Sequence, residues 1–271
     1  MIFITSDEMN SCKICRGTAE RFDVVDLAKT CNSSSVYPRG LAGIPVYYLR
    51  CRTCGFIFTD HFDHFSHRDW SEQIYNEHYI DADPEYAEIR PQGNARYLQF
   101  FLQGRKNSTV GLDFGGGNGL TARLLTQRGW RFDAYDPFGY DTTTPHSVRT
   151  YNVTSAFEVF EHLTDPVAAM EQIVSLMSSG NILIIIGTGI SDGQVDDMRR
   201  LSWWYAAPRN GHVSLYSRKS LGILAAKFGL DFVSPSGGSH FFTRGMSRTT
   251  ILARFAATAS AMRLRGFLRR N

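Results

Sequence analysis

The chain of 271 residues has no apolar run long enough to span a membrane, and Met1 to Thr5 do not form a signal-like apolar segment. It also shows no internal repeat and no long low-complexity segment. Hydrophobic residues make up 43% of the chain and the net charge is +3, which is typical of a soluble globular protein. We therefore expect a cytoplasmic protein with one sizeable domain and a small additional lobe.

Cysteine is scarce, yet four of the five cysteines fall into two Cys-x-x-Cys pairs, and Cys31 is left over. Two such pairs present four thiolates in the tetrahedral arrangement that zinc prefers. The pairs lie farther apart than in a minimal zinc ribbon, so an insertion is expected between them. Disulfides are the alternative, but the odd cysteine and the missing signal segment favour a structural zinc. The expected ligands are Cys12, Cys15, Cys51 and Cys54.

Acidic residues are absent after Asp231, whereas arginines accumulate there. Apolar residues between Thr249 and Leu268 recur with the spacing of an amphipathic helix. Such a basic tail either docks on the protein itself, forms a disordered end, or contacts an acidic membrane face, a nucleic acid or a phosphorylated substrate. The sequence leaves these alternatives open.

A glycine-rich turn is the most informative motif of the chain. Residues 110–114 are predicted to form a short buried strand that carries Asp113 near its end. A dinucleotide fingerprint holds a pyrophosphate at a helix N-terminus, but Asp113 would repel a pyrophosphate and suits a cationic amino group. The glycines expected to approach the ligand closely are Gly115, Gly116, Gly117 and Gly119.

A second predicted strand over residues 130–136 ends in Asp136, and an acid at this position can accept both hydroxyls of a ribose. Together with Asp113 and the glycines, this pattern resembles the first motifs of class I S-adenosylmethionine-dependent methyltransferases. The resemblance implies an α/β fold with a doubly wound, mostly parallel sheet of the seven-stranded type, and S-adenosylmethionine as cofactor.

The third strand of such a sheet is expected to be short or missing. Only 21 positions separate Asp136 from Phe157, and prolines, a glycine and a run of threonines in between indicate a loop. The acid that contacts adenine in this family usually follows the third strand, so it is not assigned, and Asp141 is a weak candidate.

Residues 152–163 resemble the fourth-strand motif of small-molecule methyltransferases, which implies that Phe157 and Glu158 contact the cofactor. His162 follows that strand, where a base could meet the substrate, although a bond to a nearby backbone group explains it equally well. His212 and Tyr216 follow the fifth strand, where this fold builds its acceptor pocket. The candidate catalytic residues are therefore His162, His212 and Tyr216.

Four consecutive segments are expected: a zinc-binding lobe over residues 1–65, a helical connector or lid over 66–105, a Rossmann-like core over 106–245 and the basic tail over 246–271. Tyrosines in the connector either close over the ligand or pack in the core. Three histidines recur at intervals of three residues, and a solvated linker explains them better than a second metal site. These histidines are His61, His64 and His67.

The resulting hypothesis is a methyltransferase that acts on a small molecule. Partial similarity to sugar C-methyltransferases makes a nucleotide-linked sugar or a glycan precursor a candidate acceptor. A ribosomal-RNA base methyltransferase with a zinc knuckle and a non-catalytic cofactor-binding adaptor are the alternatives, and preference for NAD would indicate an oxidoreductase. Acidic residues 81–85, near the expected pocket, make nucleic acid an unlikely partner. The oligomeric state and the methylated atom are not indicated.

Overall fold

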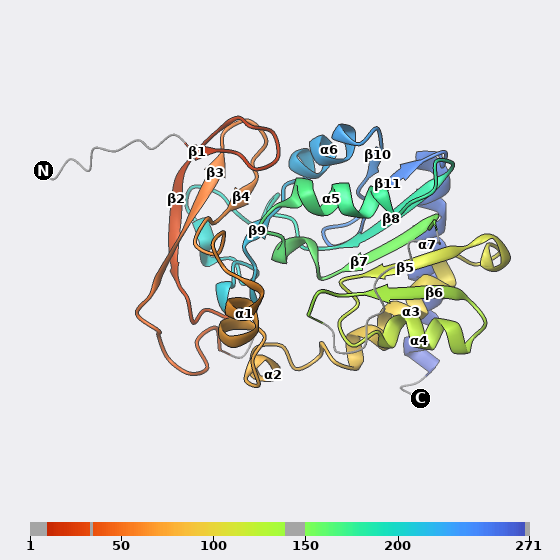
Figure 1. Cartoon of the computed structure of the whole chain (residues 1–271), viewed down its shortest axis with the longest axis horizontal. Helices are drawn as coiled ribbons and strands as arrows, with labels where there is room; N and C mark the ends of the chain where they lie inside the picture. The colour runs from red at the N-terminus through yellow and green to blue at the C-terminus, as the bar shows by residue number, and fades with distance from the viewer. Residues whose placement is uncertain (1–9, 33–34, 139–149, 269–271) are drawn as a thin grey trace, which may run out of the picture. The chain divides into compact units, whose positions relative to one another are not determined.

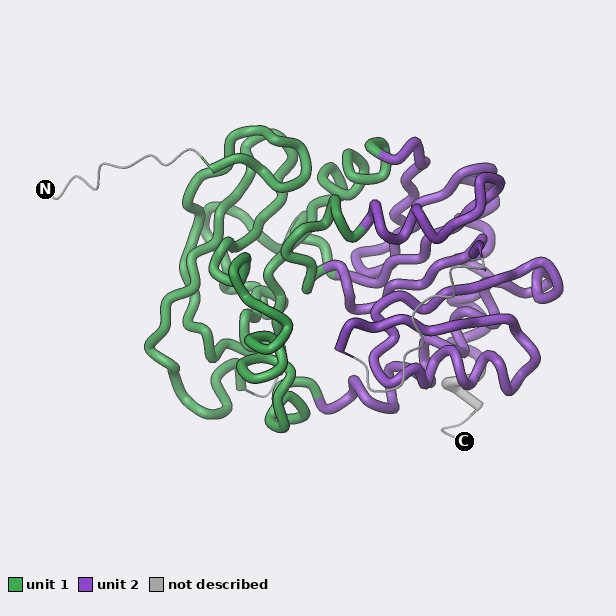
Figure 2. The backbone as a smooth tube through the Cα atoms, viewed as in Figure 1, with its two compact units in different colours: residues 1–83, 161–169, 189–227 green, residues 84–160, 170–188, 228–271 purple. Residues whose placement is uncertain are grey.

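The computed structural model describes residues 10–32, 35–138 and 150–268 of the chain, with side chains as far as Leu264. The chain divides into two compact units, each made of separate stretches of sequence (Figure 2). Unit 1 comprises residues 1–83, 161–169 and 189–227, and unit 2 comprises residues 84–160, 170–188 and 228–271. The sequence analysis divided the chain into four consecutive segments, whereas these units are groups of residues that contact one another in space. The four-segment division therefore stays a prediction.

Unit 1 contains a five-stranded antiparallel sheet in the order β1-β2-β3-β4-β9 (Figure 1). A β-bulge between Arg21 and Asp23 interrupts the pairing of β2 with β3. The first cysteine pair lies in the turn from β1 to β2, and the second lies where β3 leads to β4. The strands are β1 (Asn10–Ser11), β2 (Thr18–Asp26), β3 (Pro45–Cys51), β4 (Ile57–Phe58) and β9 (Ser214–Leu215).

The helices of unit 1 are mostly short. The longest, α6 (Arg218–Lys227), begins directly after Ser217, whose hydroxyl accepts a bond from the amide of Ser220 at 3.0 Å. The same hydroxyl donates to the carbonyl of Cys54 at 2.5 Å, so the helix start is tied to the second cysteine pair. The others are α1 (His67–Asp69), the π-helix η1 (Trp70–Ile74), α2 (Tyr79–Ala82) and the 3₁₀ turns η4 (Arg200–Ser202) and η5 (Pro208–Asn210).

Unit 2 contains a six-stranded sheet in the order β10-β11-β8-β7-β5-β6. The four strands from β8 to β6 run parallel, and β11 and β10 add antiparallel pairs at one edge. This sheet is mixed, and its four parallel strands agree with the α/β fold expected from the sequence. The strands are β5 (Val110–Phe114), β6 (Arg131–Tyr135), β7 (Val153–Phe157), β8 (Ile182–Gly187), β10 (Asp231–Val233) and β11 (His240–Arg244).

The seven-stranded form is not confirmed, because the described residues provide six strands. No strand is described between Asp136 and Val153, where the sequence predicts a short or missing third strand. Residues 139–149 fall outside the described part of the chain, and with them the candidate Asp141.

One face of this sheet carries the core of unit 2, against which α3, α4 and α7 pack (Figure 1). The rings of Phe101 from α3 and Phe241 from β11 stack 4.9 Å apart. Each buried aromatic side chain of this size contributes roughly 1.5–3 kcal/mol. The helices are α3 (Ile89–Phe101), α4 (Leu120–Gln127) and α7 (Arg248–Leu268), and 3₁₀ turn η2 (Lys106–Ser108) precedes β5. Two further elements have residues in both units. They are the turn η3 (Phe160–His162) and the helix α5 (Pro166–Ser175).

The basic tail forms the helix α7, and its first half docks on unit 2. Ile251 is fully buried, and the guanidinium of Arg254 donates to the carbonyl of Phe101 at 2.8 Å. Of the alternatives expected for the tail, the structure shows docking on the protein itself for the first half of α7. None of the described helices combines the length and the apolar character needed to cross a membrane.

Two glycine substitutions test the packing of unit 2. A Cβ at Gly111 would lie 2.3 Å from the ring of Phe132, so we expect Gly111→Ala to lower the free energy of unfolding by about 1–3 kcal/mol. Gly93 lies in α3 with open space around its Cβ position. Gly93→Ala should therefore raise the free energy of unfolding by about 0.5–1 kcal/mol. Urea unfolding of both variants measures the effects. Equal urea midpoints for the two variants would contradict the close packing of Gly111 in β5 against Phe132.

Candidate functional site

The glycine turn follows β5 and leads into α4. Gly115, Gly117 and Gly119 have φ values of 72°, 56° and 73°, a left-handed region in which a side chain is strained. The amides of Gly115 and Gly116 both donate to the carbonyl of Tyr135, at 2.7 and 3.1 Å. The turn is therefore held against the end of β6, and its alternating glycines are required by its backbone conformation.

The turn also has a tightly packed side and an open side. A Cβ at Gly115 would lie 2.4 Å from Val159, and a Cβ at Gly116 would lie 2.9 Å from the carboxylate of Asp113. A Cβ at Gly117 would meet nothing within 4 Å. A ligand can therefore approach the backbone at Gly117 closely, whereas the neighbouring glycines are needed for packing.

The carboxylate of Asp113 is buried at the end of β5, with 4% of the residue exposed. Burial raises its pKa to about 6, although hydrogen bonds from Ser155 and Thr121 act in the opposite direction. The hydroxyl of Ser155, on the neighbouring strand β7, donates to this carboxylate at 2.7 Å. A cationic ligand group beside Asp113 would favour the ionised form that burial disfavours.

Asp136 directly follows β6, as expected. Its carboxylate accepts hydrogen bonds from the amides of Gly117 at 2.8 Å and Phe138 at 2.7 Å. These bonds fix the orientation of the side chain. A carboxylate has about four acceptor positions, and these two amides use part of them.

Glu158 follows β7 with φ of 54°, an uncommon conformation for a residue with a side chain. Its amide donates to the carbonyl of Gly187 at 2.8 Å, and its carboxylate lies 3.9 Å from Arg90. Such local strain is concentrated at functional sites. Phe157, the last residue of β7, packs edge-on against Tyr97 at 5.8 Å between ring centroids.

The structure thus brings the expected cofactor-binding residues together within unit 2. They lie where the parallel strands β5, β6 and β7 end, which is the edge at which open α/β sheets bind ligands. Their roles in binding stay a prediction.

The two candidate histidines meet within unit 1. The rings of His162 and His212 lie 5.0 Å apart in an edge-on arrangement. The amide of Val213 donates to the carbonyl of Glu161 at 2.8 Å, so the two chain segments run side by side. Glu161 was not singled out as a site residue from the sequence, but it lies with both histidines: the nearest ligand atoms of the three residues are all within 4.8 Å of one another.

Tyr216 lies in a different environment. It is fully buried, and its ring centroid lies 5.1 Å from that of Phe56. Burial, reinforced by the negative charge of Glu161, raises its pKa well above the ordinary value. A phenol of this kind is a poor base, and a catalytic role for Tyr216 stays a prediction.

The four paired cysteines form one cluster in unit 1. The sulfurs of Cys12 and Cys54 are 3.6 Å apart, and those of Cys15 and Cys51 are 3.4 Å apart. A disulfide requires about 2.05 Å, and all four cysteines are free in the structure. The four sulfurs all lie within 4.8 Å of one another, as ligands of a single ion would.

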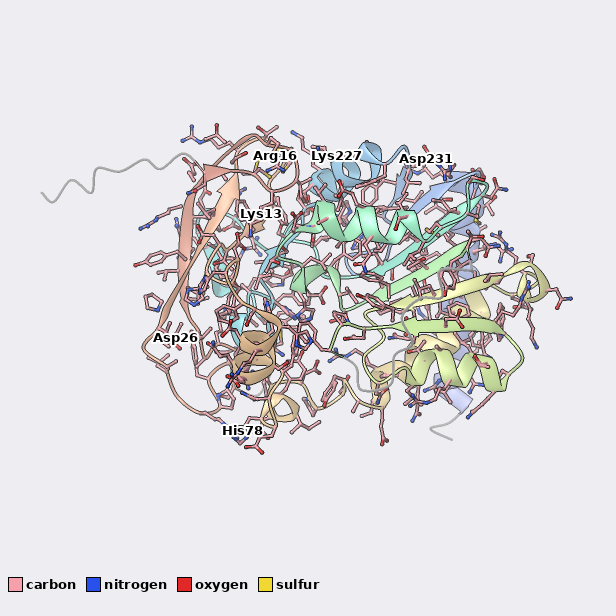
Figure 3. All side chains as sticks on the ribbon, viewed as in Figure 1. Lys13, Arg16, Asp26, His78, Lys227 and Asp231 are labelled. Carbon is pink, nitrogen blue, oxygen red and sulfur yellow. The ribbon has the colours of Figure 1, made fainter. Side chains whose placement is uncertain are left out.

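The two cysteine pairs adopt matching turns. The amide of Arg16 donates to the carbonyl of Cys12 at 3.0 Å, and the amide of Gly55 donates to that of Cys51 at 2.9 Å. Arg16 and Gly55 have φ values of 62° and 73°. Figure 3 labels Lys13 and Arg16 on the first turn and Asp26 at the far end of β2.

The three histidines of the linker do not form a metal-ligand group in the described part of the chain. His64 and His67 are exposed, and His61 is half-buried with its ring 4.9 Å from that of Phe62. Among the described residues, the possible metal-ligand groups are the cysteine cluster and the group of Glu161, His162 and His212.

Comparison with known families identifies a methyltransferase domain. A family model described as a methyltransferase domain matches residues 86–234, which is more than half of the chain. A comparison with curated proteins finds no match.

Many solved structures are similar to the chain. The plantazolicin methyltransferase BpumL in complex with SAH is 12% identical, with 65% of this chain and 88% of that chain covered and a TM-score of 0.43. RosA, the N,N-8-amino-8-demethyl-D-riboflavin dimethyltransferase from Streptomyces davawensis, is 14% identical, with 66% and 63% covered and a TM-score of 0.45. Magnesium protoporphyrin IX methyltransferase from Synechocystis PCC 6803 is 13% identical, with 68% and 95% covered and a TM-score of 0.42. At this level of similarity no conclusion about substrate follows.

The buried carboxylate leads to a prediction about stability. Its pKa of about 6 exceeds the ordinary value of 3.8, so the folded state holds the proton more tightly and stability falls as pH rises from about 4 to 6. We expect Asp113→Asn, which removes the charge, to raise the free energy of unfolding at pH 7.5 by on the order of 2 kcal/mol and to change it little at pH 4. Urea unfolding at both pH values measures this difference.

The exposed acid Asp231 is the matched control, and Asp231→Asn should change stability by less than about 0.5 kcal/mol at either pH. An Asp113→Asn variant that is less stable than the natural protein at pH 7.5 would contradict this prediction. It would show that the hydrogen bonds of the carboxylate stabilise the fold by more than the burial of its charge destabilises it.

Proposed function

Because the chain belongs to the methyltransferase domain family, we propose that it transfers a methyl group from S-adenosylmethionine to a small-molecule acceptor. One observation carries this proposal: two carboxylates and a glycine turn lie together where neighbouring parallel strands of unit 2 end. Asp113 suits a cationic amino group, and Asp136 suits the two hydroxyls of a ribose. A nucleoside that carries an amino acid has both groups.

The cofactor, when bound, supplies an activated methyl group on a sulfonium. The residues of unit 2 position it: Asp113 attracts the amino group, Asp136 accepts the ribose hydroxyls, and Gly117 leaves room for close backbone approach. Glu158 and Phe157 complete the expected contacts at the end of β7. Placement of donor and acceptor accounts for most of the acceleration in such a transfer.

Proton removal from the acceptor would fall to a histidine. A histidine titrates near neutral pH, so His162 or His212 can accept a proton from a hydroxyl group. His162 is half-buried and therefore open to solvent, whereas His212 is 5% exposed. His162 is the better candidate for a base, and Tyr216 is the weakest of the three.

For the acceptor we propose a small molecule, of which a nucleotide-linked sugar or a glycan precursor is one class. The comparisons do not favour this class over other small molecules. Identification of the acceptor requires a screen of small-molecule fractions with labelled cofactor.

We also propose that the cysteine cluster binds a structural zinc ion. Thiolates at about 2.3 Å from a tetrahedral ion lie about 3.8 Å apart, close to the separations of 3.6 and 3.4 Å in the structure. The contact between Cys12 and Cys54 lowers the pKa of the Cys12 thiol and raises that of the Cys54 thiol, so the pair shares a proton that a bound metal would displace. Four protein ligands close the site, so the ion would stabilise unit 1 and perform no chemistry. Reduced thiols fit a cytoplasmic location.

Cofactor binding is the first test. Calorimetric titration should show binding of S-adenosylhomocysteine and no response to NAD. Asp113→Asn should weaken binding at least about 100-fold because it removes a charge-assisted hydrogen bond, and Asp136→Ala should weaken it about 10- to 100-fold. Asp231→Ala, at an exposed position, is the control with unchanged affinity.

The asparagine variant separates function from folding, since it is expected to be more stable and yet unable to bind. Tight binding of NAD in place of S-adenosylhomocysteine would instead indicate an oxidoreductase.

The zinc proposal predicts that Cys51→Ser releases the metal of the cysteine cluster and lowers the melting temperature. A thiolate ligand is lost, and the binding free energy of a structural zinc is part of the folding free energy. Metal analysis of the purified protein and thermal unfolding measure both effects. Cys31→Ser, outside the cluster, is the matched control and should keep the metal. Retention of the metal in Cys51→Ser would contradict the assignment.

A further inference from the structure

The group of Glu161, His162 and His212 in unit 1 has the composition of a metal site that the proposed function does not require. We propose that these three residues bind a second divalent cation of the zinc or manganese type. The proposal is independent of the cysteine cluster, which has a different donor chemistry. It rests on how the three side chains are arranged and supported.

The donor set suits such an ion. Two imidazole nitrogens and one carboxylate oxygen are the ligands of many catalytic zinc sites and of several other first-row metal sites. The nearest ligand atoms of the three residues lie within 4.8 Å of one another. A tetrahedral ion with ligands at about 2.1 Å holds them about 3.4 Å apart, so small side-chain rotations complete the site.

The hydrogen bond of His212 prepares it as a ligand. Its Nδ1 lies 2.8 Å from the carbonyl oxygen of Tyr205. A carbonyl can only accept, so Nδ1 carries the proton, and in the neutral ring Nε2 keeps its lone pair. Metal-binding histidines almost always donate their second ring N–H in this way.

Tyr205 supports a second ligand as well. Its hydroxyl donates to Oε1 of Glu161 at 2.6 Å, and its ring centroid lies 4.3 Å from that of His212. One residue therefore orients both the carboxylate and the imidazole. Glu161 is fully buried, and pairing with a positive charge lowers the cost of burying a carboxylate. A divalent cation provides this charge.

His162 completes the group from the more open side, and with an ion bound it would act as a ligand in place of the base role proposed above. Its Nδ1 lies 3.2 Å from the hydroxyl of Tyr75, and the residue is half-buried, so an ion can reach it from solvent. Gly211 has φ of 85°, and a Cβ there would lie 3.0 Å from Nδ1 of His162. A glycine next to His212 thus lets the two histidines approach each other.

Three protein ligands leave coordination positions open, in contrast to the closed cysteine cluster. An open position on such an ion takes an oxygen donor, and the metal lowers the pKa of a bound hydroxyl group. A ligand of this ion would therefore bind through a hydroxyl, phenol or carboxylate oxygen. The metal site itself does not depend on the proposed methyl transfer.

Cobalt titration of the full-length, metal-free protein tests the site, because cobalt bound by thiolates gives a strong charge-transfer band and cobalt bound by nitrogen and oxygen does not. We expect two equivalents in the natural protein. His212→Ala should bind one equivalent with the thiolate band unchanged, and Cys51→Ser should lose the band but keep the second site. His64→Ala, at an exposed histidine outside both groups, should still bind two.

Two further variants guard against effects on folding, which circular dichroism checks in each case. His162→Ala lies at a half-buried position and should also lose one equivalent. Tyr205→Phe keeps the ring and the carbonyl but removes the hydroxyl, and it should weaken the second site about 10- to 100-fold. A natural protein that binds cobalt only through thiolates, or folded His212→Ala and His162→Ala variants that still bind two equivalents, would overturn the proposal.

Titration of the same samples with S-adenosylhomocysteine separates this inference from the proposed function. Cofactor binding with a single, thiolate-bound cobalt would exclude the second site alone. Two cobalt equivalents without cofactor binding would support the second site and contradict the methyltransferase proposal.

Discussion

The buried carboxylate of Asp113 is the constraint on which the end of unit 2 with the glycine turn depends. A charge at this depth is unfavourable, and its raised pKa reflects that burial. Ser155 on the adjacent strand holds the carboxylate in place, and the backbone of Gly116 packs directly against it. The glycine turn, the end of β6 and Asp136 are arranged around this group by hydrogen bonds to backbone atoms. A cationic ligand would relieve the unfavourable burial, which links the local energetics to the proposed binding.

Unit 1 depends on a different kind of constraint. Its sheet contains two-residue strands, and the cysteine cluster joins the turn after β1 to the region between β3 and β4. Ser217 connects the same region to the start of α6, far along the chain. A small sheet of this kind buries little apolar surface, so a bound metal ion is an effective way to stabilise it.

Features unfavourable to folding recur at the positions with proposed roles. Asp113 and Glu161 are buried carboxylates, and Glu158 has a left-handed backbone conformation. Each lies at or just beyond the end of β5 or β7 in the chain, and each has specific hydrogen-bonding partners that hold it. A sequence selected for stability alone would place apolar residues or glycine at such positions. Their presence is consistent with the binding roles proposed for them.

Local patterns in the sequence determined much of this protein. The apolar stretch before Asp113, the alternating glycines and the spacing to Asp136 identified β5, the turn and β6, because strand and turn preferences act over a few residues. The paired cysteines likewise indicated one cluster, since the chemistry of a thiolate site is carried by residue type and spacing. Tertiary structure alone decided which distant residues meet. His212 lies beside Glu161 and His162 because backbone pairing brings residues about 50 positions apart together, and Tyr205 contacts both Glu161 and His212 from a loop without a motif. Contacts of this kind depend on how the whole unit packs, and no periodicity or spacing in the sequence encodes them.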